Sequence, residues 1–491
     1  MQERLAYNEK ISLLRDDEYP MLKGITYLDH AGTSLYSKSL IDAFSREMMS
    51  QVLGNPHSTS TSALNTSQRI QDVRIRALKL FRADPEHFDI IFTANATAAI
   101  KLVLEAFAGY KSGFSYRYHR DSHTSLVGGR ELASRSQCFA SDTEVEMWMN
   151  RRRRCSLLSL FKTKKSHTNP SLFAYPAQSN MNGRRLPLTW PSKLRNSSHQ
   201  NAYTLLDAAA LVSTSPLDLS DHTTSPDFTV LSFYKIFGFP DLGCLIVRKA
   251  SAHVFEQRKY FGGGTTEMVT VSPEQWFVRK ENSLHERMED GTLAIRSIIA
   301  LGCAIDVHER LFGGLDKIST HTGFLAKYAY SILEGLRYEN GRPVCQIYKG
   351  ERSTYGDQIT QGASIAMNLL HSDGSWISSS TVQKLAKTKD IHIRTGSLCN
   401  PGGMAQTLGL GSVEIKRAFA EGFRCGQEAD VRAGVPMGMV RISFGAMSTV
   451  DDIEMFIQFL REEFVDSGGE GVGEKGVGGS SSQAESCDLK A

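Results

Sequence analysis

The order of apolar and polar positions along the chain predicts strands that alternate with helices. The first 20 residues have the spacing of an amphipathic helix, and residues 25–32 predict a short strand that breaks at Gly32. Residues 88–107 predict a strand, a turn of small residues and a helix. Further apolar runs have the length of buried strands: 203–207, 228–233 and 243–248. This alternation predicts an α/β fold with a mostly parallel central sheet covered on both faces.

The pattern changes near residue 292. A long helical segment begins there and is expected to bridge two lobes, and short strands and helices follow it. Residues 439–445 predict a strand, after which Ser448 or Thr449 could cap a helix with two aspartates in its first turn. After Val465 the chain has almost no large apolar side chains, so residues 466–491 predict a flexible tail.

Composition places the chain among ordinary globular proteins. Its 491 residues are 41% hydrophobic and 22% charged, and the length predicts more than one core. The net charge of +3 gives no reason to expect binding to nucleic acid or membranes. No apolar run reaches the ~20 residues of a membrane-spanning helix. The N-terminus lacks the apolar centre of a signal peptide, so we expect a cytoplasmic protein.

The eight cysteines are widely spaced and never form a Cys-x-x-Cys pair. This spacing disfavours a metal site, and a disulfide framework is not expected inside cells, so most thiols should be inert. Cys399 is different, because it lies within RTGSLCNPGG at 394–403. The glycines, Asn400 and Pro401 predict a flexible backbone that is neither helix nor strand. Packing residue, disulfide partner, metal ligand and nucleophile all remain open for this thiol.

A basic segment interrupts an irregular stretch at 141–170. It contains RRRR at 151–154 and KTKK at 162–165. A nuclear signal or a site for polyanions is one interpretation of this insertion, 151–165. A solvated insertion loop is the other, and we favour it because charge runs are usually solvated.

Two residues that follow predicted strands could serve one cofactor. Asp207 ends the strand of LLDAAA, and Lys235 lies in the turn after the strand of LSFYKIFG. Pyridoxal phosphate needs such a pair, a lysine for the Schiff base and an acid that keeps the pyridine nitrogen protonated. Each alone has a simpler interpretation, Asp207 as a cap and Lys235 as a surface charge.

The stretch TANATAAIK could bind the phosphate of that cofactor. A strand runs into Ala96 and Thr97 at the start of a helix, where small residues expose backbone N–H groups and the helix N-terminus favours an anion. YFGGGT at 260–265 is a second glycine-rich turn of the same type, and a plain hairpin loop explains it equally well.

Three further side chains could complete a site. His123 could stack on a cofactor ring and transfer protons, with His119 as a near competitor and a structural histidine as the default. Asn180 could hydrogen-bond a phenolic oxygen, or simply form a turn. Arg441 is a charge in an apolar strand, and its partner could be a substrate carboxylate or a structural acid.

Ten motifs occur in the order seen in class V aminotransferase-like enzymes: YLDHAG, GNPHS, TANATAAIK, DSHTS, FAYPAQSN, LLDAAA, SFYKIFGFPDLG, YFGGGT, RTGSLCNPG and VRISFG. More narrowly, residues 20–465 resemble the N-terminal domain of eukaryotic molybdenum cofactor sulfurases, the fungal versions most closely. The resemblance implies a fold-type I pyridoxal phosphate homodimer that acts as an L-cysteine desulfurase. Its persulfide sulfur would pass to the molybdenum cofactor of xanthine dehydrogenase and aldehyde oxidase.

The resemblance also implies roles by position. Lys235 would form the Schiff base, Asp207 would hold the pyridinium, and His123 would stack on the ring. Cys399 would accept the sulfur. The remaining positions match cofactor contacts near the phenolic oxygen (Asn180) and the phosphate (Ala96, Thr97, Ser232, and Thr265 towards the partner subunit), and substrate-carboxylate contacts (Asn55, Arg441).

The sequence departs from general cysteine desulfurases at two positions. Tyr234 precedes Lys235 where those enzymes have histidine, and Ala210 replaces a glutamine three residues after the aspartate. Both changes favour the molybdenum cofactor branch. Family members continue into a second domain that carries the molybdenum cofactor, whereas this chain is expected to stop after its tail.

The resemblance implies a division of the chain into an N-terminal helical segment that packs on the small domain (1–24), a large cofactor-binding domain (25–300), a small C-terminal α+β domain (301–465) and the tail (466–491). Three other functions stay open. The chain could be a general desulfurase for iron–sulfur or tRNA thiolation pathways. It could catalyse transamination or β-elimination, with Cys399 incidental, or be an inactive scaffold.

Overall fold

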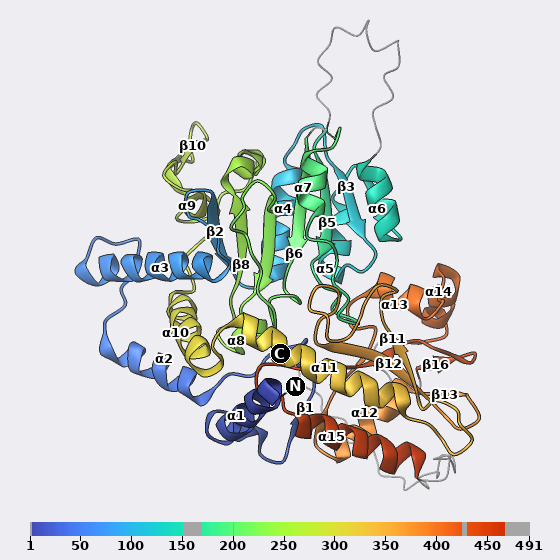
Figure 1. Ribbon diagram of the computed structural model, residues 1–491. Helices are drawn as coiled ribbons and strands as arrows, with labels where there is room; N and C mark the ends of the chain where they lie inside the picture. Colours follow the sequence, from blue (N-terminus) through green and yellow to red (C-terminus); the bar gives the residue numbers. More distant parts are fainter. Residues whose placement is uncertain (1, 151–168, 200, 425–429, 467–491) are drawn as a thin grey trace, which may run out of the picture.

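The computed structural model describes residues 2–150, 169–199, 201–424 and 430–466. Its centre is a seven-stranded sheet in the order β2-β8-β7-β6-β5-β3-β4 (Figure 1). The strands are β2 (Phe88–Thr93), β3 (Ser115–His119), β4 (Arg135–Phe139), β5 (Ser171–Pro176), β6 (Ala202–Asp207), β7 (Phe228–Ser232) and β8 (Gly243–Arg248). Of the seven strands, β8 alone runs opposite to the other six. The predicted mostly parallel sheet is therefore confirmed, and all three late apolar runs are strands in it.

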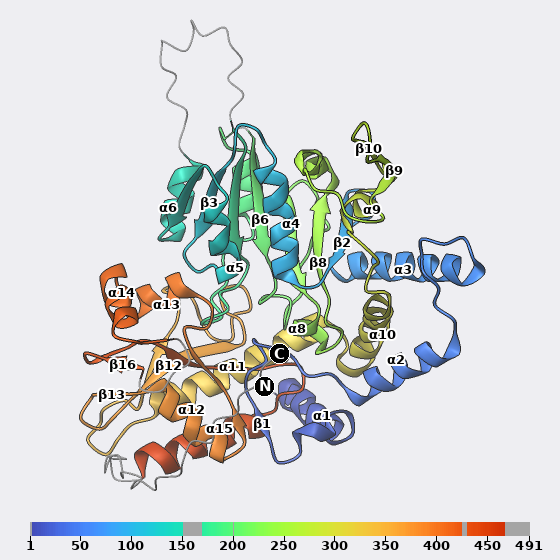
Figure 2. The ribbon, with the colours of Figure 1, turned by 180° about the vertical axis from the view of Figure 1, so that it is seen from behind.

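Both faces of this sheet are buried, as the apolar strands require. Successive residues such as Leu205 and Leu206 pack into different hydrophobic cores. Helix α4 (Ala96–Ala108) covers one face (Figure 2), and α7 (Trp190–Arg195) covers the other (Figure 1). Also in this half are α2 (Lys38–Ser50), α3 (Thr61–Leu80), α5 (Thr124–Val127), η2 (Gly128–Glu131), α6 (Asp142–Met149), α8 (Tyr234–Phe237), η4 (Lys249–Gln257), the β9–β10 hairpin (Thr266–Thr270, Trp276–Arg279), α9 (Leu284–Met288) and α10 (Ile295–Phe312).

A second, smaller sheet packs against helices with a core of its own. Its antiparallel strands are β11 (Cys345–Tyr348), β12 (Ser364–Leu370), β13 (Trp376–Ile377), β15 (Arg394–Gly396) and β18 (Met439–Ser443). The covering helices are α11 (Leu315–Gly335), α12 (Ser379–Thr388) and α15 (Val450–Leu460), the last followed by η5 (Arg461–Val465). Beside them lie α13 (Pro401–Thr407), α14 (Ser412–Ala420) and the β16–β17 pair (Val431–Arg432, Val435–Pro436).

The N-terminal segment contacts both halves. In helix α1 (Gln2–Glu18), the Tyr7 hydroxyl donates a hydrogen bond to the Phe312 carbonyl. Arg15 of the same helix forms an ion pair with Asp452 of α15 at 2.6 Å. After η1 (Pro20–Leu22), strand β1 (Thr26–Tyr27) pairs in parallel with β14 (Ile391–His392). The first strand of the chain therefore joins the C-terminal half.

Two expectations about elements need correction. The stretch 141–170 is not irregular at its start, because Ser141 caps α6 and Val145, Trp148 and Met149 bury its inner face. Residues 151–168, with the basic insertion, lie outside the described residues. The helix expected to bridge two lobes, α10, packs only in a core of the seven-stranded sheet. The bridging helix is α11, which begins in that core at Leu315 and continues into the core of the smaller sheet.

The end of the chain follows its sequence signals. Thr449, rather than Ser448, caps α15 in a capping box with Asp452. The tail is described only to residue 466. In the described ranges, no helix combines the length and apolar character needed to cross a bilayer.

Candidate functional site

A polar cavity of about 180 Å³ opens where β6 and β7 end and α4 begins. It is lined by Asn95, Ala96, Thr97, Ile100, His123, Ser125, Pro176, Gln178, Asn180, Asp207, Ala209, Ala210, Ser232, Tyr234 and Lys235. Seven of the candidate site residues from the sequence therefore meet in one place. The carboxyl ends of parallel strands are where open α/β sheets bind ligands.

Part of the cavity lining carries backbone N–H and hydroxyl groups of the kind that can bind an anion. The Asn95 side chain caps α4, because its Oδ1 accepts from the Ala98 N–H at 3.0 Å. The N–H of Ala96, the first residue of the helix, donates to the Ser232 hydroxyl at 2.9 Å. The Thr97 hydroxyl lies in the same turn. Gly243 permits this geometry, because a Cβ there would lie 2.5 Å from Asn95 Cα. Hydroxyl groups at a helix N-terminus form a suitable anion site.

Asp207 is a buried carboxylate for which the described part of the chain provides no ion pair. Its Oδ1 accepts from the Ala209 N–H at 3.0 Å. An ionised carboxylate in such a place favours a cationic group in the adjoining cavity. The protonated nitrogen of a pyridine ring meets that requirement.

Lys235 follows β7 in the short helix α8. Burial lowers the pKa of its amine, Asp207 opposes this shift, and the nearby Arg441 adds to it. Burial likewise lowers the pKa of His123, again opposed by Asp207 and supported by Lys235. Both shifts favour neutral groups, an amine able to attack a carbonyl carbon and an imidazole able to accept a proton.

Together these groups fit pyridoxal phosphate. The cavity joins groups suited to an anion, a buried carboxylate and a lysine whose pKa burial lowers. Those are the partners of a phosphate, a pyridinium nitrogen and an aldehyde carbon.

Cys399 lies beside this cavity. Its turn is shorter than the sequence predicts, and a strand and a helix flank it directly. Residues 394–396 form β15 and α13 starts at Pro401, because β15 pairs with β18 and Asn400 caps the helix. Only residues 397–400 are irregular. The thiol is exposed, and its carbonyl accepts from the Thr124 N–H at 3.0 Å.

The turn adopts an unusual backbone conformation. Leu398 and Cys399 both have φ of 55°. For residues other than glycine this left-handed conformation costs about 1–2 kcal/mol each. Contacts outside the turn must hold it.

Asn180 joins the cavity to the cysteine turn. Its Nδ2 donates to the Leu398 carbonyl at 2.6 Å, and its Oδ1 accepts from Asn400 Nδ2 at 3.2 Å. Arg441, also buried, donates through Nη1 to the Asn180 carbonyl at 2.7 Å and through Nη2 to Asp29 at 2.5 Å. A structural acid therefore pairs with this arginine in the present state.

Thr265 and Asn55 lie away from this cavity. Thr265 is buried, and its hydroxyl donates to the Gly262 carbonyl at 2.7 Å. Asn55 is exposed and accepts from the His57 N–H at 3.0 Å. Their two loops touch, because a Cβ on Gly264 would lie 2.6 Å from His57.

Sequence reasoning did not include several residues that line the cavity. Ser125 pairs its hydroxyl with that of Thr97 at 2.7 Å and with His123 Nδ1 at 3.0 Å. Its position two residues after His123, at a helix start, was an available signal. Gln178 is buried and donates to the Ala210 carbonyl at 3.1 Å. It lies in the quoted motif FAYPAQSN, yet nothing local distinguishes it from a turn residue.

The competing histidine and the other described cysteines have different surroundings. His119 is fully buried and lies 3.2 Å from Asp142, outside the cavity. Burial raises the pKa of Cys345 to about 12 and that of Cys244 well above its usual range, so both thiols stay protonated. Cys138 is exposed like Cys399, but it lies on β4 away from the cavity lining.

Comparison with known proteins adds independent findings. Residues 26–456 match the family model of Aminotransferase class-V. The molybdenum cofactor sulfurase of Aspergillus fumigatus is 54% identical over 466 residues, which are 94% of this chain and 54% of that protein. The molybdenum cofactor sulfurase of Neurospora crassa is 53% identical over 463 residues, 93% of this chain and 48% of that protein. The chain thus spans about half the length of the curated relatives it matches.

Solved structures share the fold at low sequence identity. A cysteine desulfurase from Thermococcus onnurineus NA1 superposes with a TM-score of 0.69 at 19% identity, covering 91% of this chain and 96% of that one. The cysteine desulfurase CsdA from Escherichia coli gives 0.64 at 18% identity, covering 92% and 98%. These likenesses establish the same architecture.

Proposed function

The chain belongs to the class V aminotransferase family, and on this basis we propose that it is a pyridoxal phosphate-dependent L-cysteine desulfurase that supplies sulfur to the molybdenum cofactor. One observation carries the proposal. Lys235, Asp207 and His123 line one cavity, and the Cys399 turn is hydrogen-bonded to the residue that follows His123. The names of the curated relatives support the acceptor.

The residues divide the work of cofactor binding. Ala96, Thr97 and Ser232 would bind the phosphate, and Asp207 would hold the pyridine nitrogen in its protonated form. Lys235 would hold the cofactor through its aldehyde carbon, while Asn180 and His123 would contact the ring. Pyridoxal phosphate, when bound, supplies an electron sink conjugated with the α-carbon of an amino acid.

The chain's own groups then carry the sulfur chemistry. With the cofactor bound, Lys235 would take the α-proton of L-cysteine, and Arg441 would hold the substrate carboxylate. The Cys399 thiolate attacks the substrate sulfur, the substrate Cβ–S bond breaks, and an S–S bond forms on Cys399. The electron pair of the broken bond would stay with the substrate carbon; His123 would supply a proton to Cβ and Lys235 would return one to Cα, and the three-carbon remainder would leave as alanine.

A homodimer is part of the proposal. Thr265 would contact the phosphate bound by the partner subunit, and Asn55 the substrate carboxylate there. The adjoining loops of these two residues, both away from this chain's cavity, support that assignment. The β9–β10 hairpin also exposes apolar side chains suited to a subunit interface: Met268, Val269, Val271, Trp276 and Phe277.

The remaining features of the proposal concern organisation. We keep as proposed bounds 25–300 for the cofactor-binding domain, 301–465 for the small domain and 1–24 for a segment contacting the small domain. Two separate cores support a division into two domains, although residues 301–312 of α10 pack in the core of the large sheet and β1 pairs with β14. Residues 466–491 remain a proposed flexible tail. Cytoplasmic xanthine dehydrogenase and aldehyde oxidase would be the final recipients of the sulfur.

Product analysis with defined acceptors tests this function. The protein, loaded with pyridoxal phosphate, receives L-cysteine and a molybdenum hydroxylase whose cofactor lacks the terminal sulfur. We expect alanine to form and the hydroxylase to gain activity. Alanine with transfer only to an iron–sulfur scaffold or a tRNA thiolation protein would identify a general desulfurase. Pyruvate or a thiol keto acid would identify elimination or transamination, and absence of cofactor binding would identify a scaffold.

A further inference from the structure

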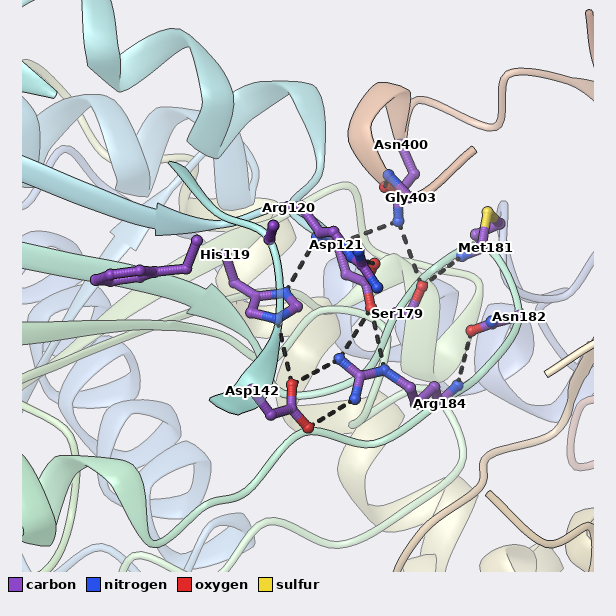
Figure 3. A network of polar contacts seen from close by, with 12 residues as sticks. His119, Arg120, Asp121, Asp142, Ser179, Met181, Asn182, Arg184, Asn400 and Gly403 are labelled. Atoms are coloured by element: carbon purple, nitrogen blue, oxygen red, sulfur yellow. Dashed lines mark hydrogen bonds and ion pairs between the residues drawn. The ribbon is translucent and has the colours of Figure 1, made fainter. Parts of the chain in front are cut away.

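Asn400, the residue after Cys399, is completely buried and hydrogen-bonds to three residues in two other segments of the chain. Its Nδ2 donates to the Asp121 carbonyl at 3.0 Å, to the Ser179 hydroxyl at 3.3 Å and to Asn180 Oδ1 at 3.2 Å. Its Oδ1 accepts from the Gly403 N–H at 3.0 Å and so caps α13. Figure 3 shows Asn400 above Asp121 and Ser179, with the cap at Gly403.

The segments that accept hydrogen bonds from Asn400 are also hydrogen-bonded to each other. Arg184 donates through Nε to Asp121 at 3.1 Å and binds both oxygens of Asp142 at 2.8 and 3.0 Å. Asp142 lies 3.2 Å from His119, and the Asp121 N–H donates to His119 Nδ1 at 3.1 Å (Figure 3). Bidentate, charge-assisted contacts of this kind fix geometry strongly. Asn400 is thus anchored to a rigid frame.

Two more hydrogen bonds hold the turn at its backbone. The Thr124 N–H donates to the Cys399 carbonyl, and Asn180 Nδ2 donates to the Leu398 carbonyl. The turn needs such support, because Leu398 and Cys399 are both left-handed. Without these contacts the local backbone preference would move the thiol away from its present place.

We propose that Asn400 is a positioning residue, whose amide donors hold the strained turn so that the Cys399 thiol stays beside the cofactor cavity. The proposal rests on the proposed function for its purpose, although the contacts exist without it. Asn400 also orients the Asn180 amide. It donates to Asn180 Oδ1 and leaves Asn180 Nδ2 to bond Leu398. Hydrogen bonds therefore join the cavity wall to the cysteine turn.

The first test separates the two roles of the Asn400 side chain, capping of α13 and donation to the neighbouring segments. Asn400→Ser keeps an oxygen that can cap α13 and removes the donors to Asp121, Ser179 and Asn180. We expect pyridoxal phosphate affinity within twofold of the parent and at least a tenfold fall in the rate of persulfide formation on Cys399. Ser60→Ala, which removes the exposed cap of α3, is the control and should change neither.

A second variant reaches the turn from its other side. Thr124 is the first residue of α5, where proline is tolerated, and His123 already has the extended conformation (φ −59°, ψ 151°) that precedes proline. Thr124→Pro deletes the N–H that holds the Cys399 carbonyl and, besides it, only an exposed threonine side chain. We expect a fall of threefold or more in persulfide formation while Asn400 stays intact.

A readout in cofactor-free protein keeps the inference independent of catalysis. Hydrogen exchange at the Thr124 amide reports the bond to Cys399, and we expect it to be at least tenfold faster in Asn400→Ser, with Ser60→Ala unchanged. Parent-like exchange and parent-like persulfide formation in folded Asn400→Ser would overturn the proposal. If the parent forms no persulfide, the proposed function fails, yet accelerated exchange at Thr124 would still establish the positioning role.

Discussion

The guanidinium of Arg441 donates through Nη2 to Asp29 Oδ1 at 2.5 Å, joining β18 to the loop after β1 across 412 residues of sequence. Its Nη1 bonds the Asn180 carbonyl, and its Nε has no hydrogen-bond partner among the described residues. Arg441 is thus both a structural link and a buried cation next to the cavity. An incoming substrate carboxylate would share the arginine with Asp29 or displace it.

Substitution of Arg441 tests its part in substrate binding. Arg441→Gln should raise KM for L-cysteine about 10- to 100-fold, because a charge-assisted hydrogen bond contributes about 1.5–3 kcal/mol. Steady-state alanine formation measures this change. Arg394→Gln is the matched control, since exposed Arg394 faces Arg441 across β15 and β18 and should alter KM little. An unchanged KM in folded Arg441→Gln would leave only the structural pairing with Asp29.

Removal of the Lys235 amine tests cofactor attachment. Lys235→Ala should lose the cofactor adduct that borohydride fixes to the protein, because the neutral amine favoured by burial is then absent. Peptide mass spectrometry after reduction locates the adduct. Lys101→Ala, an exposed position on α4, should leave the adduct on Lys235. An adduct on another lysine in the parent protein would refute the assignment.

A buried ion pair between Arg74 and Glu289 holds β2, the strand that leads to the start of α4. Arg74 donates two hydrogen bonds to Glu289 at 2.8 and 2.9 Å, and Glu289 also accepts from the Phe92 N–H. Glu289→Ala should lower the free energy of unfolding by about 3–5 kcal/mol, because a buried arginine is left unpaired. Thermal denaturation of cofactor-free protein measures the loss.

A solvent-exposed pair provides the comparison for that substitution. Asp306→Ala breaks the contact of Asp306 with Arg76 and should cost at most about 1 kcal/mol. Equal losses in Glu289→Ala and Asp306→Ala would contradict the structural role of the buried pair.

Acid sensitivity should arise in part from His321. This buried histidine contacts the Ser448 carbonyl at 2.8 Å, and burial lowers its pKa to about 4, although that contact opposes the shift. At pH values between the pKa of His321 in the unfolded state and about 4, the unfolded state binds a proton that the folded state does not. Stability therefore falls as pH drops through this window, by about 2 kcal/mol at pH 5.

His321→Gln isolates this contribution, because glutamine can donate to the Ser448 carbonyl but does not titrate. Melting temperatures at pH 7.5 and pH 5 should differ less in the variant than in the parent. An equal difference would show that other groups cause the acid sensitivity.

The central pair of the site could be predicted because its signals are local. Asp207 and Lys235 each follow an apolar strand, and parallel neighbours β6 and β7 bring their ends together. The partner of Arg441 could not be predicted, because Asp29 reaches it only through the pairing of β1 with the C-terminal half.

The cysteine turn shows a different limit. Its glycines indicated flexibility, but the structure uses two of them for close packing. A Cβ on Gly402 would lie 2.5 Å from the Arg120 carbonyl, and one on Gly403 would lie 2.7 Å from Asn400 Oδ1. Composition alone does not distinguish a mobile loop from one packed tightly against a distant segment.

Transfer of sulfur to Cys399 is the central claim, and isotope-resolved mass spectrometry tests it most directly. The cofactor-loaded protein is mixed with L-cysteine carrying ³⁴S, alkylated and digested. One labelled sulfur should appear on the Cys399 peptide, reducible by thiol and absent in Lys235→Ala, with Cys138→Ser behaving as the parent. Label on Cys138 instead, or undiminished alanine formation by Cys399→Ser without added thiol, would contradict the account.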